Sequence, residues 1–190
     1  MKILIPNAVT LMGALSALLS LLWAPTRPYW AGNALIAASL FDMIDGRVAR
    51  ALDAHSAIGR ELDSLVDVIA FGVAPAFLLF STAYREWGTL AEVPIGVLPM
   101  FAFVGASATR LALFNSRPDA DGSTFTGIPT PVAALLVVTA TMTWHEVGWP
   151  LFADSRFLCA LMVGASVLMV APIPFPSFKS FRTKLGMVLY

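Results

Sequence analysis

The chain has 190 residues, of which 58% are hydrophobic and 13% are charged, and its mean hydropathy is +0.78. This composition excludes an ordinary soluble globular protein and predicts an all-α, polytopic integral membrane protein. The formal net charge is zero and no long basic run is present, so nothing indicates binding to nucleic acid. Cys159 is the one cysteine, which excludes an internal disulfide.

Apolar runs long enough to cross a hydrocarbon core about 30 Å thick predict a helical bundle with about six transmembrane helices. We treat residues 1–190 as a single membrane-embedded domain. In the first half we expect helices over Ala8–Trp23 (with Asn7 as N-cap), Trp30–Leu52 and Ile58–Tyr84. In the second half we expect helices over Val93–Phe114, Gly127–Trp144 and Arg156–Val170. Residues 115–126, rich in Asp, Ser, Gly and Pro, are predicted to form a loop.

Six spans place both termini on the same side of the membrane. Nine of the 12 Lys and Arg residues then fall on the side of the termini, although three of the nine belong to one acidic segment. The positive-inside rule places that side in the cytoplasm. We therefore expect a protein of the cell's inner (plasma) membrane whose acidic segment faces the cytoplasm.

The acidic segment, residues 42–67, contains two pairs of aspartates at helical spacing. Asp42 and Asp45 share one helix face, and so do Asp63 and Asp67. Each charged carboxylate deep in a bilayer costs roughly 2.5–3.5 kcal/mol, so the four need compensation. Divalent metal is the simplest source, because hard cations take carboxylate oxygens as ligands. Two such metals could assist a displacement at phosphorus.

Three further residues of this segment suit a phosphate-containing ligand. Arg50 lies eight residues after Asp42, within about 80° of it around a helix, and could hold a phosphate bidentately. Gly46 and Gly59 each cost a helix roughly 1 kcal/mol relative to alanine. Because glycine has no side chain, it lets another group approach the helix backbone closely. That group is either a flat base or, in simple packing, a neighbouring helix.

The segment matches the pattern D-x2-D-G-x2-A-R-x8-G-x3-D-x3-D at all eight fixed positions. This pattern resembles the signature of the CDP-alcohol phosphatidyltransferase family. Other segments resemble the phosphatidylserine synthase branch of that family: PNAVT (6–10), RELDSLVDVIAFGVAP (60–75), RLALFN (110–115), FTGIP (125–129) and, weakly, PFPSFK (174–179). Gly13 and Leu113 stand where members of that branch often carry a polar and a basic residue, which keeps other acceptor alcohols open.

The resemblance implies an enzyme that transfers the phosphatidyl group of CDP-diacylglycerol to the hydroxyl of L-serine, releasing CMP and giving phosphatidylserine. It implies a homodimer and two divalent cations, Mg²⁺ or Mn²⁺, held by the four aspartates, with Asp67 also acting as the catalytic base. The remaining residues that it implies for CDP-lipid binding are Gly46, Ala49, Gly59 (cytidine), Arg50 (phosphates), Asn7 and Thr10. For Asn7, a role as helix cap is an equal alternative.

Acceptor recognition is expected from polar residues on the predicted cytoplasmic side. Serine carries a carboxylate and an ammonium group, and Arg110, Asn115 and Arg117 could bind them, with Arg110 as the carboxylate partner. The alternative for Arg110 is an interfacial anchor. Since no separate nucleophilic side chain is indicated, we expect direct in-line displacement at phosphorus.

Three other functions remain open on the residues alone. The same transferase chemistry could use glycerol 3-phosphate, an inositol phosphate or choline as acceptor. A membrane prenyltransferase also binds a metal-bound diphosphate through aspartate pairs, although it does not explain Gly46, Ala49, Arg50 and Gly59. A divalent-cation transporter would place carboxylates along a path through the membrane, whereas these four gather near one interface.

Overall fold

The computed structural model describes residues 4–54, 56–84, 87–90, 93–116, 124–147 and 155–176. Within these ranges the chain forms six helical segments and four very short strands. The first two helical segments are α1 (Leu4–Trp23) and α2 (Pro28–Ala51). The third is one continuous helix made of α3 (Ala57–Asp67), η1 (Val68–Val73), α4 (Ala74–Leu79) and η2 (Phe80–Tyr84). The last three are α5 (Val97–Asn115), α6 (Thr130–Val147) and α7 (Ser155–Val170). The all-α membrane bundle predicted from the sequence is therefore confirmed.

In the described part of the chain, three helical segments are long and apolar enough to cross a membrane: Leu4–Trp23, Ala57–Ala83 and Val97–Asn115. The apolar α7 is shorter, at 16 residues. Membrane crossing by α2, α6 and α7 stays a prediction. Helix α1 has an apolar outer face that suits lipid: Leu22 is 73% exposed, while Gly13, Ala17 and Ser20 of the same helix are buried.

Some predicted boundaries are wrong. Asn7 is not an N-cap, because α1 already includes Leu4, and Pro6 is tolerated in the first turn, where its missing N–H would have no helical partner. Residues 93 and 94 do not begin the fourth helix. They form β2 (Val93–Pro94), which pairs with β1 (Thr89–Leu90), because proline disfavours a helical residue before it.

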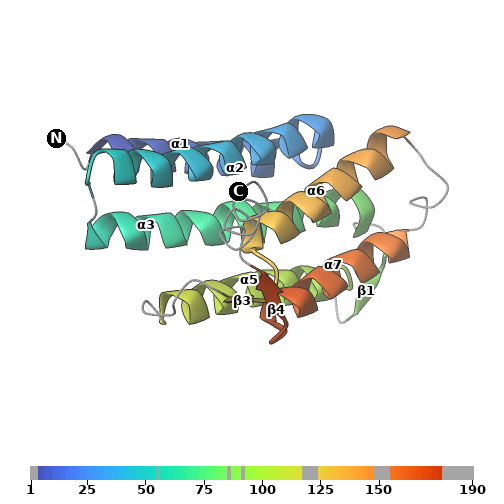
Figure 1. The fold of residues 1–190 in the computed structure, drawn as a ribbon. Helices are drawn as coiled ribbons and strands as arrows, with labels where there is room; N and C mark the ends of the chain where they lie inside the picture. Colours follow the sequence, from blue (N-terminus) through green and yellow to red (C-terminus); the bar gives the residue numbers. More distant parts are fainter. Residues whose placement is uncertain are drawn as a thin grey trace, which may run out of the picture.

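The predicted loop over residues 115–126 is also partly wrong. Asn115 is the last residue of α5, and β3 (Thr124–Thr126) pairs with β4 (Pro174–Pro176) in an antiparallel ribbon. Residues 117–123 lie outside the described residues. Ribbon β3–β4 thus joins the chain before α6 to the chain after α7 (Figure 1).

Helices α1 and α2 pack side by side along one edge of the bundle, α5 and α7 along the other, and the helix that begins at α3 runs between them (Figure 1). Small residues make the α1–α2 contact close: α1 buries Thr10, Gly13, Ala17 and Ser20 at spacings of three or four residues. Because this contact brings the backbones together, the polar residues near its end are held in fixed positions.

The central helix contains two π-helical stretches, η1 and η2, on either side of α4. The first follows directly after Asp67, and Pro75 lies two residues after its end without ending the helix. Phe71, in η1, and Leu78, in α4, are buried against α1, α2 and α6. The helix that carries two of the aspartates is therefore anchored in the core of the bundle.

Candidate functional site

The four aspartates of the acidic segment lie at one end of the bundle, where α1 begins, α2 ends, α3 begins and α5 ends (Figure 1). Asp42 and Asp45 come from the last turns of α2, and Asp63 and Asp67 from α3. Carboxylate oxygens of Asp42, Asp63 and Asp67 all lie within 4.8 Å of one another. Asp42 and Asp67 are close enough for a hydrogen bond between their carboxyl groups. These three side chains form a group that could hold a metal ion.

Asp45 is not one of these three, although it lines the same small pocket. Its Oδ2 accepts a hydrogen bond of 2.8 Å from Thr10 Oγ1 on α1, and the side chain is almost fully buried at 6% exposure. The Thr10 hydroxyl also lies 3.1 Å from the carbonyl of Pro6. The contact between α1 and α2 therefore fixes the orientation of the fourth carboxylate.

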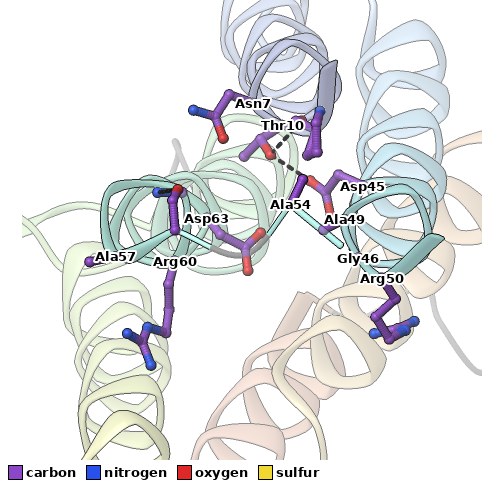
Figure 2. Close-up of a pocket in the computed structure, with 13 residues that line it drawn as sticks. Asn7, Thr10, Asp45, Gly46, Ala49, Arg50, Ala54, Ala57, Arg60 and Asp63 are labelled. Atoms are coloured by element: carbon purple, nitrogen blue, oxygen red, sulfur yellow. Dashed lines mark hydrogen bonds between the residues drawn. The ribbon is translucent and has the colours of Figure 1, made fainter. Parts of the chain in front are cut away.

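Beside the aspartates lies a cavity of about 490 Å³, which we call the large cavity. Its lining, drawn in Figure 2, consists of Pro6, Asn7, Thr10, Asp45, Gly46, Ala49, Arg50, Ala54, Ser56, Ala57, Gly59, Arg60 and Asp63. A much smaller pocket, of about 10 Å³, adjoins it and is lined by all four aspartates. All six residues expected to bind the CDP-lipid line the large cavity, and two of the four aspartates do so as well.

Arg50 and Arg60 extend from α2 and α3 toward the same side of the large cavity (Figure 2). Both side chains are exposed, and neither has an ion-pair partner in the described part of the chain. Two unpaired guanidinium groups next to a cluster of carboxylates give the cavity a basic rim and an acidic floor. This arrangement suits a phosphate ester bridged to metal ions.

Gly59 has two side chains so close to it that little room remains for a Cβ. Its backbone N–H donates a hydrogen bond of 2.9 Å to Oγ of Ser56, which is the N-cap of α3. A Cβ at this position would lie 2.9 Å from that Oγ and 3.0 Å from Oδ1 of Asn7. Gly46 differs, because a Cβ there would lie 3.6 Å from Arg50 Nη1, an ordinary contact. Its missing side chain leaves space in the cavity itself.

The residues expected to bind the acceptor are not gathered in one place. Arg110, on α5, is half-buried and close enough to Asp67 for a favourable charge interaction. Asn115 is exposed, and its Nδ2 donates to Ser64 Oγ at 2.9 Å. Arg117 lies outside the described residues. Neither Arg110 nor Asn115 lines the large cavity.

Sequence reasoning missed two polar residues at this end of the bundle. Arg60 was available from its spacing, because it follows Gly59 and lies three residues before Asp63 on the same helix. Thr130, whose Oγ1 accepts a hydrogen bond of 3.0 Å from Arg110 Nη1, gave no local signal, because its partner is 20 residues away on another helix.

Comparison with known families now adds to this geometry. The family model described as CDP-alcohol phosphatidyltransferase matches residues 3–172. The chain belongs to the CDP-alcohol phosphatidyltransferase family. The resemblance inferred from the acidic segment is thereby confirmed, and the cavity and aspartates described above are those of a member of this family.

Similar proteins come from bacteria and archaea. A Helicobacter pylori protein named CDP-diacylglycerol--serine O-phosphatidyltransferase is 35% identical over 188 residues, covering 98% of this chain and 77% of the relative. A Mycobacterium leprae protein of the same name is 34% identical, covering 90% of this chain. An archaetidylserine synthase from Methanothermobacter thermautotrophicus is 35% identical, covering 92% of this chain and 70% of the relative. The chain spans 57% of the length of the M. leprae relative.

Proposed function

We propose that this protein transfers the phosphatidyl group of CDP-diacylglycerol to the hydroxyl of L-serine, giving phosphatidylserine and CMP. The observation that carries the proposal is the convergence of Asp42, Asp63 and Asp67 beside a large cavity with a basic rim. Relatives named for serine transfer, both bacterial and archaeal, support the choice of acceptor. Because the carboxylates gather at one end of the bundle, a transferase site explains them better than a path for ions across the membrane.

The donor set fits hard divalent cations. Three carboxylates within 4.8 Å repel one another unless a positive charge or a proton lies between them, and oxygen ligands suit Mg²⁺ and Mn²⁺. We assign two cations to the site, held by Asp42, Asp63 and Asp67 together with Asp45 from the large cavity. When bound, such ions neutralise diphosphate charge and polarise the phosphorus.

The large cavity takes the cytidine diphosphate part of the donor lipid. Gly46, Ala49 and Gly59 leave space for the flat base, and the exposed guanidinium groups of Arg50 and Arg60 bind phosphate oxygens. Asn7 and Thr10, on α1, close the opposite wall, as Figure 2 shows. The diacylglycerol chains then extend into the surrounding lipid.

In this proposal Asp67 acts as the base. It accepts the proton of the serine hydroxyl while the serine Oγ attacks the phosphorus of the phosphatidyl group. The new bond joins Oγ to that phosphorus, and the bond between phosphorus and the oxygen of CMP breaks in line with it. No residue forms a covalent intermediate in this scheme, so configuration at a chiral phosphorus is expected to invert; retention would contradict it.

Arg110 binds the serine carboxylate in this proposal. Its position near Asp67 places a cation on the side of the base that faces α5 and α6. Asn115 and Arg117 follow it in the chain and are proposed to contribute at the edge of the acceptor site. The protein is further proposed to act as a homodimer in the inner (plasma) membrane, with the aspartates facing the cytoplasm.

The purified protein tests the proposal directly. CMP release from CDP-diacylglycerol is measured with Mn²⁺ or Mg²⁺ and with L-serine, glycerol 3-phosphate, an inositol phosphate or choline as acceptor. We expect release that depends on serine and is abolished by EDTA. Release with glycerol 3-phosphate and not with serine would keep the transferase chemistry and overturn the acceptor, whereas metal flux into proteoliposomes without CMP release would overturn both.

A further inference from the structure

Arg110 and Thr130 form a polar pair inside the bundle, away from the large cavity. The Nη1 atom of Arg110, on α5, donates a hydrogen bond of 3.0 Å to Oγ1 of Thr130, the first residue of α6. Thr130 is fully buried, with 0% of its surface exposed. A buried hydroxyl that accepts from a guanidinium fixes the direction in which the planar group points, because the fork of donors is rigid.

The opposite edge of the same guanidinium has no hydrogen-bond partner among the described residues. Arg110 Nε is buried and makes no hydrogen bond within the described part of the chain. A buried donor without a partner costs about 1–3 kcal/mol, so its retention next to a reaction site indicates a ligand. With Nη1 held by Thr130, the edge formed by Nε and Nη2 is the one available to a planar anion such as a carboxylate.

The position of Thr130 is itself fixed by the backbone around it. Gly127 has a φ of +74°, and a Cβ there would overlap the carbonyl of Met169 on α7. Its N–H donates to Ile173 O at 3.0 Å, and the N–H of Ile128 donates to Leu168 O at 3.1 Å. These contacts, together with ribbon β3–β4, tie the start of α6 to the end of α7. The hydroxyl of Thr130 is thus presented to α5 by a rigid turn.

We infer that Thr130 is a positioning residue for the acceptor: it turns the Nε edge of Arg110 toward the carboxylate of the amino-acid substrate and so makes the site selective for an acceptor with a carboxylate. This inference rests on the proposed function. Thr130 acts through Arg110 and does not touch the reacting atoms. Without the hydrogen bond to Thr130, the Arg110 guanidinium keeps its charge near Asp67, but its Nε edge is no longer held toward the acceptor.

The test compares two acceptors and three variants of the full-length protein. L-serine carries the carboxylate, whereas serinol carries a hydroxymethyl group in its place and is assayed as an alternative acceptor or as a competitive inhibitor. Thr130→Val keeps the shape of the side chain and removes the acceptor oxygen, and Thr130→Ser keeps the oxygen. Thr141→Val is the matched control, because Thr141 is a buried threonine of the same helix whose hydroxyl bonds to the carbonyl of Val137.

We expect Thr130→Val to raise the KM for L-serine about 10-fold. The KM for CDP-diacylglycerol, the kcat at saturating serine and the affinity for serinol should change less than about twofold. Thr130→Ser should restore the KM for serine, and Thr141→Val should resemble the unmodified protein. An unchanged KM for serine in Thr130→Val would overturn the inference and leave the proposed function standing.

Three other outcomes are equally decisive. A rise in KM for serine, serinol and CDP-diacylglycerol together would show a loosened bundle and overturn the positioning role. If Thr130→Val does not fold, Arg110→Lys serves as the second variant, because it keeps the charge and removes the Nε edge. We expect it to lose discrimination between serine and serinol; retained discrimination would overturn the inference. An unmodified protein without serine-dependent CMP release would instead overturn the proposed function.

Discussion

The large cavity draws its lining from α1, the end of α2 and the start of α3, whereas the Arg110–Thr130 pair joins two helices that are linked through residues 116–129 and tied to α7. The cavity is wide, and glycines and exposed arginines line it. The pair consists of a half-buried guanidinium and a buried hydroxyl, and within the described residues its buried donor without a partner is Arg110 Nε. In the proposed function the two parts therefore bind by different means: the cavity by its shape and several charges, and the pair by the direction of one guanidinium. A substitution in one part should therefore leave binding at the other part unchanged. Substitution of the aspartates, which lie between the two parts, should affect both.

The largest effect is expected where the two parts meet. Asp67→Asn removes the proposed base and a proposed metal ligand, and we expect CMP release to fall by about 10²–10⁴-fold, the range for loss of a positioned base. Asp63→Asn should have a comparable effect through the ligand set. Asp53→Asn is the control, because Asp53 is exposed nearby and asparagine tolerates its φ of +48°. Activity of Asp67→Asn within tenfold of the unmodified protein would show that another group takes the proton.

A smaller effect should separate the cavity from the acceptor pair. Arg50→Ala removes a charged hydrogen-bond donor to phosphate, which is worth about 1.5–3 kcal/mol, and should raise the KM for CDP-diacylglycerol roughly 10- to 100-fold. The KM for serine should remain unchanged. Arg47→Ala provides the comparison, because Arg47 is an exposed arginine of the same helix that does not line the cavity. Equal effects of the two substitutions would indicate a general loss of surface charge.

The turn before α6 offers the corresponding test on the acceptor side. In Gly127→Ala, the new Cβ meets the Met169 carbonyl, and a positive φ costs a non-glycine residue about 1–2 kcal/mol. The start of α6 must shift, and we expect the KM for serine to rise several-fold while the KM for CDP-diacylglycerol is unchanged. Gly164→Ala, on α7, has no atom within 4 Å of its added Cβ and serves as control. A change confined to the donor lipid would reverse the assignment of the two sides.

The smallest effect concerns the wall of the cavity. Gly59→Ala places a methyl group against Ser56 Oγ and Asn7 Oδ1, and those side chains can give way by a few tenths of an ångström. We expect the KM for CDP-diacylglycerol to rise about two- to fivefold and the melting temperature to fall slightly, because the N-cap of α3 is disturbed. Gly105→Ala, on α5, meets nothing within 4 Å and should change neither quantity. Full activity of Gly59→Ala would mean that the wall adapts freely.

The large cavity and the Arg110–Thr130 pair also differ in how far they could be predicted from the sequence. The aspartates and Arg50 are spaced along two helices that adjoin in the chain, so helical periodicity was enough to bring them to one end of the bundle. The orientation of the Asp45 carboxylate depends on a hydrogen bond from Thr10, 35 residues away, and was not predictable. The pairing of Arg110 with Thr130 depends on a turn that is fixed by Met169 and Ile173, which are far away in the sequence. Local sequence patterns were therefore enough to predict the aspartates and Arg50. The arrangement of Arg110 and Thr130 depends on tertiary contacts and could not be predicted from them.

The π-helical stretch η1 joins the part of the central helix that carries Asp63 and Asp67 to its apolar part. A π-helical turn contains an additional residue, so the helix faces before and after η1 are rotated relative to each other. Asp63 and Asp67, before η1, can thus point toward α2 while Leu78, after η1, still faces the core. Deleting one residue from η1 would turn the carboxylates away from their partners without making the helix any less hydrophobic. Such a chain would still enter the membrane, but its aspartates would no longer lie close together.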